Sequence, residues 1–175
     1  MRLASPFNNR QNSSSFANCN KSGAALSVEI YWQGWFDGSA RPNPGDIGIG
    51  VLLLAPDARR FEKSERLSGS GCNNEAELQA LCALLEMAWV AGARRLQVRG
   101  DSDMAIRYVN GPESTVIEPL FTLILRAREL MAHFDDVQLS WIPQQRNAEA
   151  DRLSRQALGL PDRPDIVRKP KRSRR

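Results

Sequence analysis

The sequence has few of the residues from which disulfide frameworks, zinc sites and nucleophilic active sites are built. Its 175 residues include three cysteines, an odd number without Cys-x-x-Cys spacing, and a single histidine, His133. This usage argues against a disulfide scaffold or a zinc site and is typical of a reducing compartment, so we predict a cytoplasmic protein. No arrangement of Ser, Cys and His indicates a nucleophile for covalent catalysis.

Long apolar runs are also missing. No stretch is long and apolar enough to cross a membrane, and the N-terminus lacks the apolar core of a secretory signal. Residues 1–27 contain three basic groups, no acid and several Ser and Asn, a composition that an organelle transit peptide shares. We predict no membrane partner, no obligate protein partner and a monomer.

Charge is divided unevenly along the chain. Of a total formal charge of +4, residues 161–175 contribute +5 and residues 1–27 contribute +3, which leaves −4 for residues 28–160. A basic, proline-containing tail is typically disordered and attracted to polyanions, although it can also serve only to solubilise the protein. We therefore predict a disordered extension (1–27), one folded domain (28–160) and a disordered basic tail (161–175).

Hydrophobic periodicity predicts the element order βββαβααβα for the folded domain. Strands are expected at 28–36, 48–55, 60–67, 96–98 and 137–142. Helices are expected at 73–90, 102–109, 117–134 and 147–158. Short turns make the first three strands antiparallel, and helical crossovers make the last two parallel to the first. The predicted fold class is α/β, with a mixed five-stranded sheet flanked by helices.

Four carboxylates lie where an acid is costly unless a cation compensates its charge. Asp37 is expected to end the first strand, and Asp101 to end the fourth. Glu77 shares the apolar face of the helix over 73–90, and Asp151 lies in the first turns of the last helix. Each alone has an ordinary explanation as a turn residue, cap or first-turn acid. Together they indicate a hard divalent metal, Mg²⁺ or Mn²⁺.

The segments that contain these acids make the chain resemble type 1 ribonuclease H. They are Phe-Asp-Gly-Ser (36–39) with Pro-Asn-Pro-Gly (42–45), Asn-Asn-Glu-Ala-Glu-Leu (73–78), Gly-Asp-Ser (100–102) and Asn-Ala-Glu-Ala-Asp-Arg-Leu (147–153). The resemblance covers residues 28–160 and implies a ribonuclease H-like fold. It also implies an endoribonuclease that cleaves the RNA strand of RNA/DNA hybrids.

The resemblance assigns roles to individual residues. Four catalytic residues are implied that hold two Mg²⁺ ions, with Mn²⁺ as an alternative: Asp37, Glu77, Asp101 and Asp151. Five substrate-binding residues are implied around the catalytic turn: Gly38, Ser39, Asn43, Asn73 and Asn74. The asparagines have competing structural explanations as turn formers or helix caps.

The sequence departs from the family at two connections. Many bacterial members have a histidine in the loop before the last catalytic Asp, whereas this loop, 143–147, has none and His133 belongs to the preceding helix. We expect a histidine-assisted step to be absent, or performed by Gln144, Gln145 or Arg146. Residues 110–115 join two helices directly, where many members have an extra helix and a basic loop that grip the DNA strand.

Two alternatives keep the same fold. One is a nuclease that prefers double-stranded RNA, and the other is a non-catalytic nucleic-acid-binding module. The intact acids argue against the second, because four carboxylates near phosphates would only weaken binding. We also expect the four tryptophans to lie in the core rather than to stack on bases.

Overall fold

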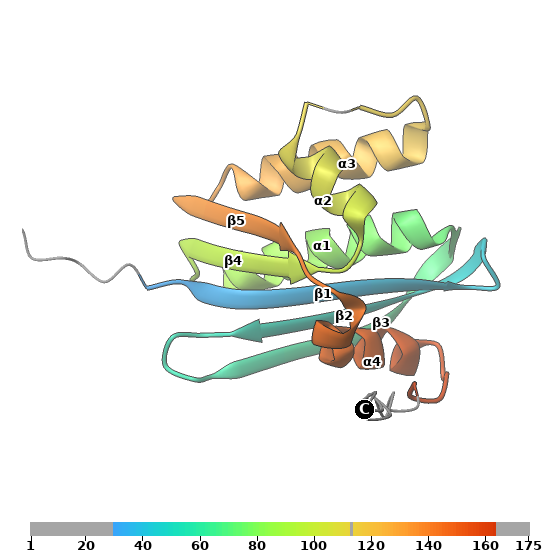
Figure 1. The fold of residues 1–175 in the computed structure, drawn as a ribbon, viewed down its shortest axis with the longest axis horizontal. Coiled ribbons are helices and arrows are strands. Elements are labelled where there is room, and N and C mark those ends of the chain that lie inside the picture. The colour runs from blue at the N-terminus through green and yellow to red at the C-terminus, as the bar shows by residue number, and fades with distance from the viewer. Residues whose placement is uncertain (1–29, 113, 164–175) are drawn as a thin grey trace, which may run out of the picture.

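The computed structural model describes residues 30–112 and 114–163, and its elements follow the predicted order (Figure 1). The strands are β1 (Trp32–Arg41), β2 (Gly45–Leu54), β3 (Arg60–Gly71), β4 (Arg95–Gly100) and β5 (Asp136–Trp141). The helices are α1 (Asn73–Val90), α2 (Asp103–Asn110), α3 (Glu118–Met131) and α4 (Ala148–Ala157), with a 3₁₀ helix, η1 (Gln144–Arg146), before α4. The predictions of disorder for residues 1–27 and for the tail beyond 163 lie outside the described residues.

The five strands form one mixed sheet in the order β3-β2-β1-β4-β5. The pairs β1–β2 and β2–β3 are antiparallel, and the pairs β1–β4 and β4–β5 are parallel. Short connections join the antiparallel strands, whereas α1 and the α2–α3 pair provide the crossovers that parallel strands require. This arrangement confirms the predicted fold class. Among the described residues, no helix has the length and apolar character to span a bilayer.

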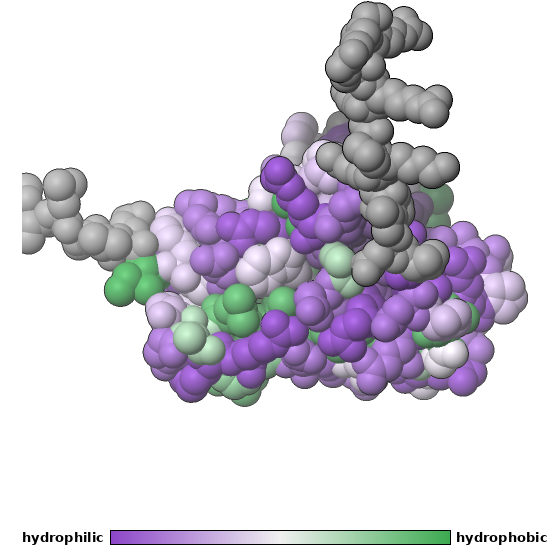
Figure 2. Space-filling view, turned by 60° about the horizontal axis from the view of Figure 1, so that its bottom comes forward, coloured by the Kyte–Doolittle hydropathy of each residue, from purple (hydrophilic) through white to green (hydrophobic). Residues whose placement is uncertain are grey.

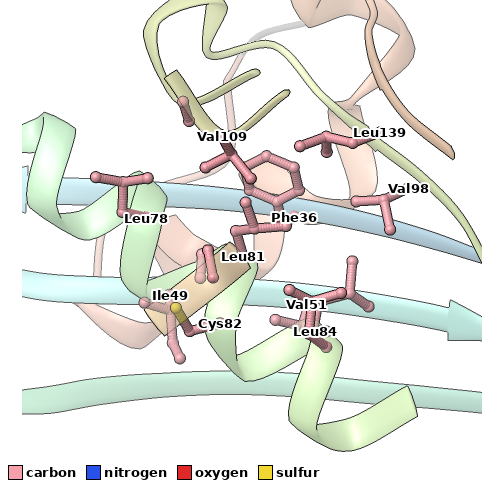
Figure 3. Close-up of a cluster of buried hydrophobic side chains, with 14 of the residues drawn as sticks. Phe36, Ile49, Val51, Leu78, Leu81, Cys82, Leu84, Val98, Val109 and Leu139 are labelled. Carbon is pink, nitrogen blue, oxygen red and sulfur yellow. The ribbon is translucent and has the colours of Figure 1, made fainter. Parts of the chain in front are cut away.

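The main core lies between one face of the sheet and the helices α1 and α3. Leu78, Leu81 and Leu85 recur along α1 at helical spacing and are fully buried. They belong to one cluster with strand side chains such as Phe36 and Val98, and Figure 3 shows Leu78 and Leu81 beside these two. Burying each such side chain contributes about 1.5–3 kcal/mol, so this core holds α1 at a fixed height above β1.

Helix α4 covers the other face of the sheet, opposite α1, α2 and α3 (Figure 1). Because side chains alternate along β2, Ile49 points into the main core, whereas Gly48 and Gly50 face α4. A Cβ atom on Gly50 would lie 2.1 Å from the carbonyl oxygen of Ala150. The backbone of α4 therefore rests directly on β2. On this side the visible surface is mostly hydrophilic, with small apolar patches (Figure 2).

Strand β1 is longer than the sequence predicted. The prediction that Asp37 ends the first strand is wrong, because β1 stays paired with β2 from Gln33 to Arg41, up to the tight turn at 42–44. Asp37 therefore lies inside a strand, where the neighbouring backbone is fixed on one side by β2.

Two tryptophans also differ from expectation. Trp89 is 39% exposed and Trp141 is 52% exposed, so the prediction that all four tryptophans are core residues is wrong for these two. Trp89 lies near the end of α1 and packs against His133 and Arg94 at the surface. Trp141 ends the edge strand β5, where one side of the strand has no neighbouring strand.

The close approach of α4 to β2 gives a test of the fold. We expect Gly50→Ala to lower the free energy of unfolding by about 1–3 kcal/mol or more, because its methyl group overlaps backbone atoms of α4. Gly34→Ala is the matched control, since its Cβ would meet only the side-chain end of Leu84, 2.8 Å away. Urea unfolding followed by tryptophan fluorescence measures both, and equal losses would contradict the proposed backbone contact.

Candidate active site

The predicted acids gather where the parallel strands β1 and β4 part. Pairing between these strands ends at Trp35 and Arg99. Asp37 and Asp101 lie two residues further along the chain from that last pair, on the same faces as Trp35 and Arg99. Because β1 continues along β2 while the chain leaves β4 at Gly100, the two carboxylates border the same opening.

Glu77 joins them from α1. The helix lies so close to β1 that a Cβ atom on Gly38 would be 2.1 Å from the carbonyl carbon of Ala76. In this position the backbone N–H of Gly38 donates a hydrogen bond to the Glu77 carboxylate. One carboxylate oxygen from each of Asp37, Glu77 and Asp101 lies within 4.8 Å of the others. The structure thus brings three of the four predicted acids into one cluster.

Asp151 adjoins this cluster but is not among the three closest. It lies in the first turn of α4 and is buried. Its Oδ1 atom forms an ion pair with Nη2 of Arg163, 2.8 Å away. The Arg155 guanidinium donates to the carbonyl oxygen of Pro161, which fixes the chain before Arg163 against α4. The basic segment after α4 therefore contributes a cation to the site.

Burial and mutual repulsion change the ionisation of these acids. Burial raises the pKa of Asp37 to about 7; repulsion from Asp101 and Asp151 adds to the shift, while the Ser154 hydroxyl and Arg163 oppose it. The pKa of Glu77 is raised well above its usual value, first by burial and then by repulsion from Asp37 and Asp101. Burial also raises the pKa of Asp151, against the opposing charges of Arg163 and Arg155.

The donor atoms of the cluster suit a hard divalent cation. They are carboxylate oxygens only, the ligands that Mg²⁺, Mn²⁺ and Ca²⁺ prefer. One oxygen of Glu77, Oε2, is buried and accepts no hydrogen bond from any described residue. A bound cation would satisfy that oxygen and would also favour the ionised forms of Asp37 and Glu77. The arrangement is therefore a candidate divalent metal site.

The predicted substrate-binding residues lie beside the cluster, and two of them have structural roles. Asn43 Oδ1 accepts a hydrogen bond from the backbone N–H of Asn73 at 3.1 Å, and Asn73 Oδ1 accepts one from the backbone N–H of Ala40 at 2.8 Å. These bonds tie the β1–β2 turn to the start of α1. Asn43, Asn73 and Asn74 are exposed. Their Nδ2 groups donate to no described residue and remain free for a ligand.

Gly38 and Ser39 are less accessible than expected. Gly38 is buried beneath α1, so contact with the helix backbone explains its lack of a side chain. Ser39 is partly buried, and its Oγ lies 3.2 Å from that of Ser154. Of the five predicted substrate contacts, the three asparagines are therefore the best placed to meet a ligand.

The only histidine lies away from the site. His133 follows α3 and packs on Trp89, with ring centroids 5.6 Å apart. It precedes β5, whereas the acids lie beyond the opposite end of the β4–β5 pair. Gln144, Gln145 and Arg146 form η1 and are exposed. His133 thus has a packing contact at the surface, remote from the acids.

The sequence interpretation missed two polar residues that touch the acids. Asn147 Nδ2 donates to Asp101 Oδ1 at 2.6 Å, and Ser154 Oγ donates to Asp37 Oδ2. Asn147 directly precedes α4, four positions before Asp151, and Ser154 lies within α4, three positions after Asp151 and on the same helix face as Asp151. For Ser154, a polar residue on the buried face of an amphipathic helix was the one available signal.

Comparison with known proteins places this geometry in a family. Residues 35–157 match the model of the family described as "Reverse transcriptase-like". The chain is 36% identical to ribonuclease HI of Halobacterium salinarum over 124 residues, which are 71% of this chain and 62% of that protein. It is 32% identical to a bifunctional protein of Mycobacterium tuberculosis over 123 residues, 70% of this chain and 34% of that protein. The matched part of the chain thus spans about three fifths of the length of the first relative and about one third of the length of the second.

Two solved ribonuclease H1 structures are also similar to this chain. The crystal structure of ribonuclease H1 from Halobacterium salinarum superimposes with a TM-score of 0.70 and 35% identity, covering 74% of this chain and 98% of that one. A ribonuclease H1 called LC11, crystallised with an RNA/DNA hybrid, superimposes with a TM-score of 0.67 and 28% identity. That match covers 73% of this chain and 96% of the LC11 chain.

The raised pKa values predict how stability depends on pH without metal. Between the ordinary pKa of Asp, 3.8, and the pKa of about 7 for Asp37, the folded chain binds more protons than the unfolded chain. Stability should therefore fall as pH rises through this interval. Asp37→Asn should flatten the fall and be more stable than wild type near pH 8, by about 1–3 kcal/mol.

Thermal unfolding in EDTA from about pH 5 to pH 8, followed by addition of Mn²⁺, tests this prediction. Mn²⁺ should raise the Tm of the wild type more at the higher pH, where more ligands are ionised. An Asn variant with the same pH dependence as the wild type would show that Asp37 does not carry the shifted titration.

Proposed function

Because the chain belongs to the reverse transcriptase-like family, we propose that it is a type 1 ribonuclease H, an endoribonuclease that hydrolyses the RNA strand of RNA/DNA hybrids. Its resemblance to that enzyme, noted from the sequence, agrees with the curated and structural relatives. The observation that carries the proposal is the cluster of Asp37, Glu77 and Asp101, whose oxygens lie within 4.8 Å of one another. Such a cluster is costly in a protein that does not bind a cation.

The residues of the cluster would hold the metal ions. We assign the two-ion site to four carboxylates: Asp37, Glu77, Asp101 and Asp151. When bound, a pair of Mg²⁺ or Mn²⁺ ions lowers the pKa of the attacking water and stabilises the leaving oxygen of the phosphodiester. The chain itself supplies fixed ligand positions, since the carboxylates come from β1, α1, α4 and the end of β4.

Selection of the hybrid would come from the edge of the site. The exposed amides of Asn43, Asn73 and Asn74 lie on the β1–β2 turn and the start of α1. Free amide donors at such an edge suit the 2′-hydroxyl groups that distinguish RNA from DNA. The hybrid bound in the structure of the LC11 ribonuclease supports this substrate class.

Other features of the proposal concern the whole chain. We assign the catalytic domain to residues 28–160 and a polyanion-binding role to the basic tail beyond it. A cytoplasmic, monomeric enzyme without an obligate protein partner stays our prediction. With no histidine in the connection between β5 and α4, the histidine-assisted step would be absent, or Gln144, Gln145 and Arg146 would assist there by donating hydrogen bonds to water or phosphate rather than by transferring a proton.

Removal of the Asp37 carboxylate is the direct test of the activity. Asp37→Asn should abolish cleavage of the RNA strand, a loss of at least about 10³-fold. The asparagine keeps the shape of the aspartate but removes the charged metal ligand. The same variant should bind the hybrid in EDTA as tightly as wild type or more tightly, since one negative charge near the phosphates is gone. Labelled RNA in hybrid, duplex and single-stranded form, with Mg²⁺, Mn²⁺ or EDTA, provides the assay.

The other outcomes distinguish the alternatives. Cleavage of the RNA duplex in preference to the hybrid would favour a nuclease of the same fold with double-stranded RNA preference. Binding of the hybrid without cleavage under any metal condition would favour a non-catalytic module. Glu149→Gln serves as a control, because this exposed acid of α4 is paired with Arg60 and Arg152 at the surface rather than with the cluster.

Truncation after Arg163 tests the proposed role of the tail. The missing residues 164–175 contain six basic groups and one acid, while the ion pair of Arg163 with Asp151 is kept. The truncated chain should bind the hybrid more weakly, and its log affinity should fall less steeply with log salt concentration. Fluorescence anisotropy over a salt series measures the slope, and an unchanged slope would exclude the tail from binding.

A further inference from the structure

Two buried polar side chains, one directly before α4 and one on its buried face, need an explanation. Asn147 is 1% exposed and Ser154 is 0% exposed, although this face otherwise carries apolar residues such as Ala150 and Leu153. Burying an amide or a hydroxyl is unfavourable unless the group is hydrogen-bonded. Their partners therefore indicate what these side chains contribute.

Asn147 joins the two parallel strands that carry acids. Its Nδ2 group donates to the carbonyl oxygen of Phe36 at 2.9 Å and to Asp101 Oδ1 at 2.6 Å. An amide nitrogen has two hydrogens, so both are used. The backbone of Asn147 is itself held, since its N–H donates to Gln144 and its carbonyl oxygen accepts the first hydrogen bond of α4, from Asp151. Asp101 is thus fixed relative to the residue that precedes Asp37.

Ser154 holds the other carboxylate. Its hydroxyl donates to Asp37 Oδ2 and also lies 3.0 Å from the carbonyl oxygen of Asp151. A hydroxyl has one proton, and a carboxylate is a stronger acceptor than a carbonyl oxygen, so the proton goes to Asp37 when it is ionised. The Ser39 hydroxyl, 3.2 Å away, can then donate to Ser154. This chain of donors orients Asp37.

The attachment of both residues to α4 makes them act together. Asn147 directly precedes α4, and Ser154 lies on the face of α4 that packs on the sheet, so one helix sets the positions of both. That face is held at the sheet by the contact of α4 with Gly48 and Gly50. Without hydrogen bonds, like-charged carboxylates would turn away from each other. With them, one oxygen of each carboxylate, Asp37 Oδ2 and Asp101 Oδ1, is held by a donor, which sets the direction of the other oxygen.

We propose that Asn147 and Ser154 are positioning residues that preorganise Asp101 and Asp37 for the divalent cation. This inference rests on the proposed function, because it concerns the same metal site. It adds that α4 contributes more than the ligand Asp151. The helix also fixes the orientation of two ligands from other elements. Groups that orient metal ligands in this way commonly change metal affinity by about 10–100-fold when they are removed.

The test measures binding of Mn²⁺ to the full-length protein without nucleic acid, by calorimetry. Asn147→Ala should weaken binding by about 10–100-fold, and Ser154→Ala by about tenfold. Ser64→Ala is the matched control, because its hydroxyl also bonds α4, at the carbonyl oxygen of Leu153, but touches no acid. Its affinity should equal that of the wild type.

A double variant shows whether Asn147 acts through Asp101. In an Asp101→Asn background, Asn147→Ala should cause little further loss of Mn²⁺ affinity, whereas a merely structural role would leave its effect unchanged. Thermal unfolding confirms that each variant is folded. If Asn147→Ala fails to fold, Ser154→Ala still tests the proposal, because replacing serine by alanine changes the side-chain volume only slightly.

The failures of the two proposals are distinguishable. Wild-type protein that binds no Mn²⁺ and cleaves no hybrid would overturn the proposed function, and this inference with it. Wild type that binds and cleaves, beside Asn147 and Ser154 variants that bind Mn²⁺ as tightly as Ser64→Ala, would overturn the inference alone.

Discussion

Repulsion between buried and half-buried carboxylates is the constraint on which the rest of this structure depends. Asp37, Glu77, Asp101 and Asp151 lie in one site, and among the described residues the cation paired with them is Arg163. Without a metal ion, Asp37 and Glu77 hold their protons to a higher pH than usual. The fold must therefore hold mutually repelling carboxylates close together, and this requires that the elements carrying them are packed rigidly.

That support comes from two helices pressed onto opposite faces of the sheet. Gly38 lets α1 approach β1, and Gly50 lets α4 approach β2, each at a distance that a side chain would prevent. The main core holds α1 in place, and the backbone of α4 rests directly on Gly48 and Gly50 of β2. Since β1 and β4 part after Trp35 and Arg99, acids from both faces can meet in the opening. The glycines that allow close packing of the helices therefore also bring the repelling carboxylates together.

The sequence predicted those features that depend on a local motif or on the periodic spacing of apolar residues. Helical spacing predicted α1 with its observed bounds, and the acids with their flanking motifs predicted the three carboxylates that meet, together with Asp151 beside them. It could not show that β1 continues past Asp37, because that depends on pairing with β2. Nor could it show that Asn147 and Ser154 face the acids, since an Asn before a helix and a Ser within one are ordinary. Their roles arise from tertiary contacts alone.

The four acids differ in how firmly the protein holds them. Asp37, Glu77 and Asp101 accept hydrogen bonds from Ser154, the Gly38 backbone and Asn147, all set in the body of the fold. Asp151 is instead paired with Arg163, whose side chain is 47% exposed. An exposed guanidinium exchanges a carboxylate for water or phosphate at little cost. Three of the four carboxylates are therefore held by groups in the body of the fold, while the fourth is held by a cation that can exchange it for another partner.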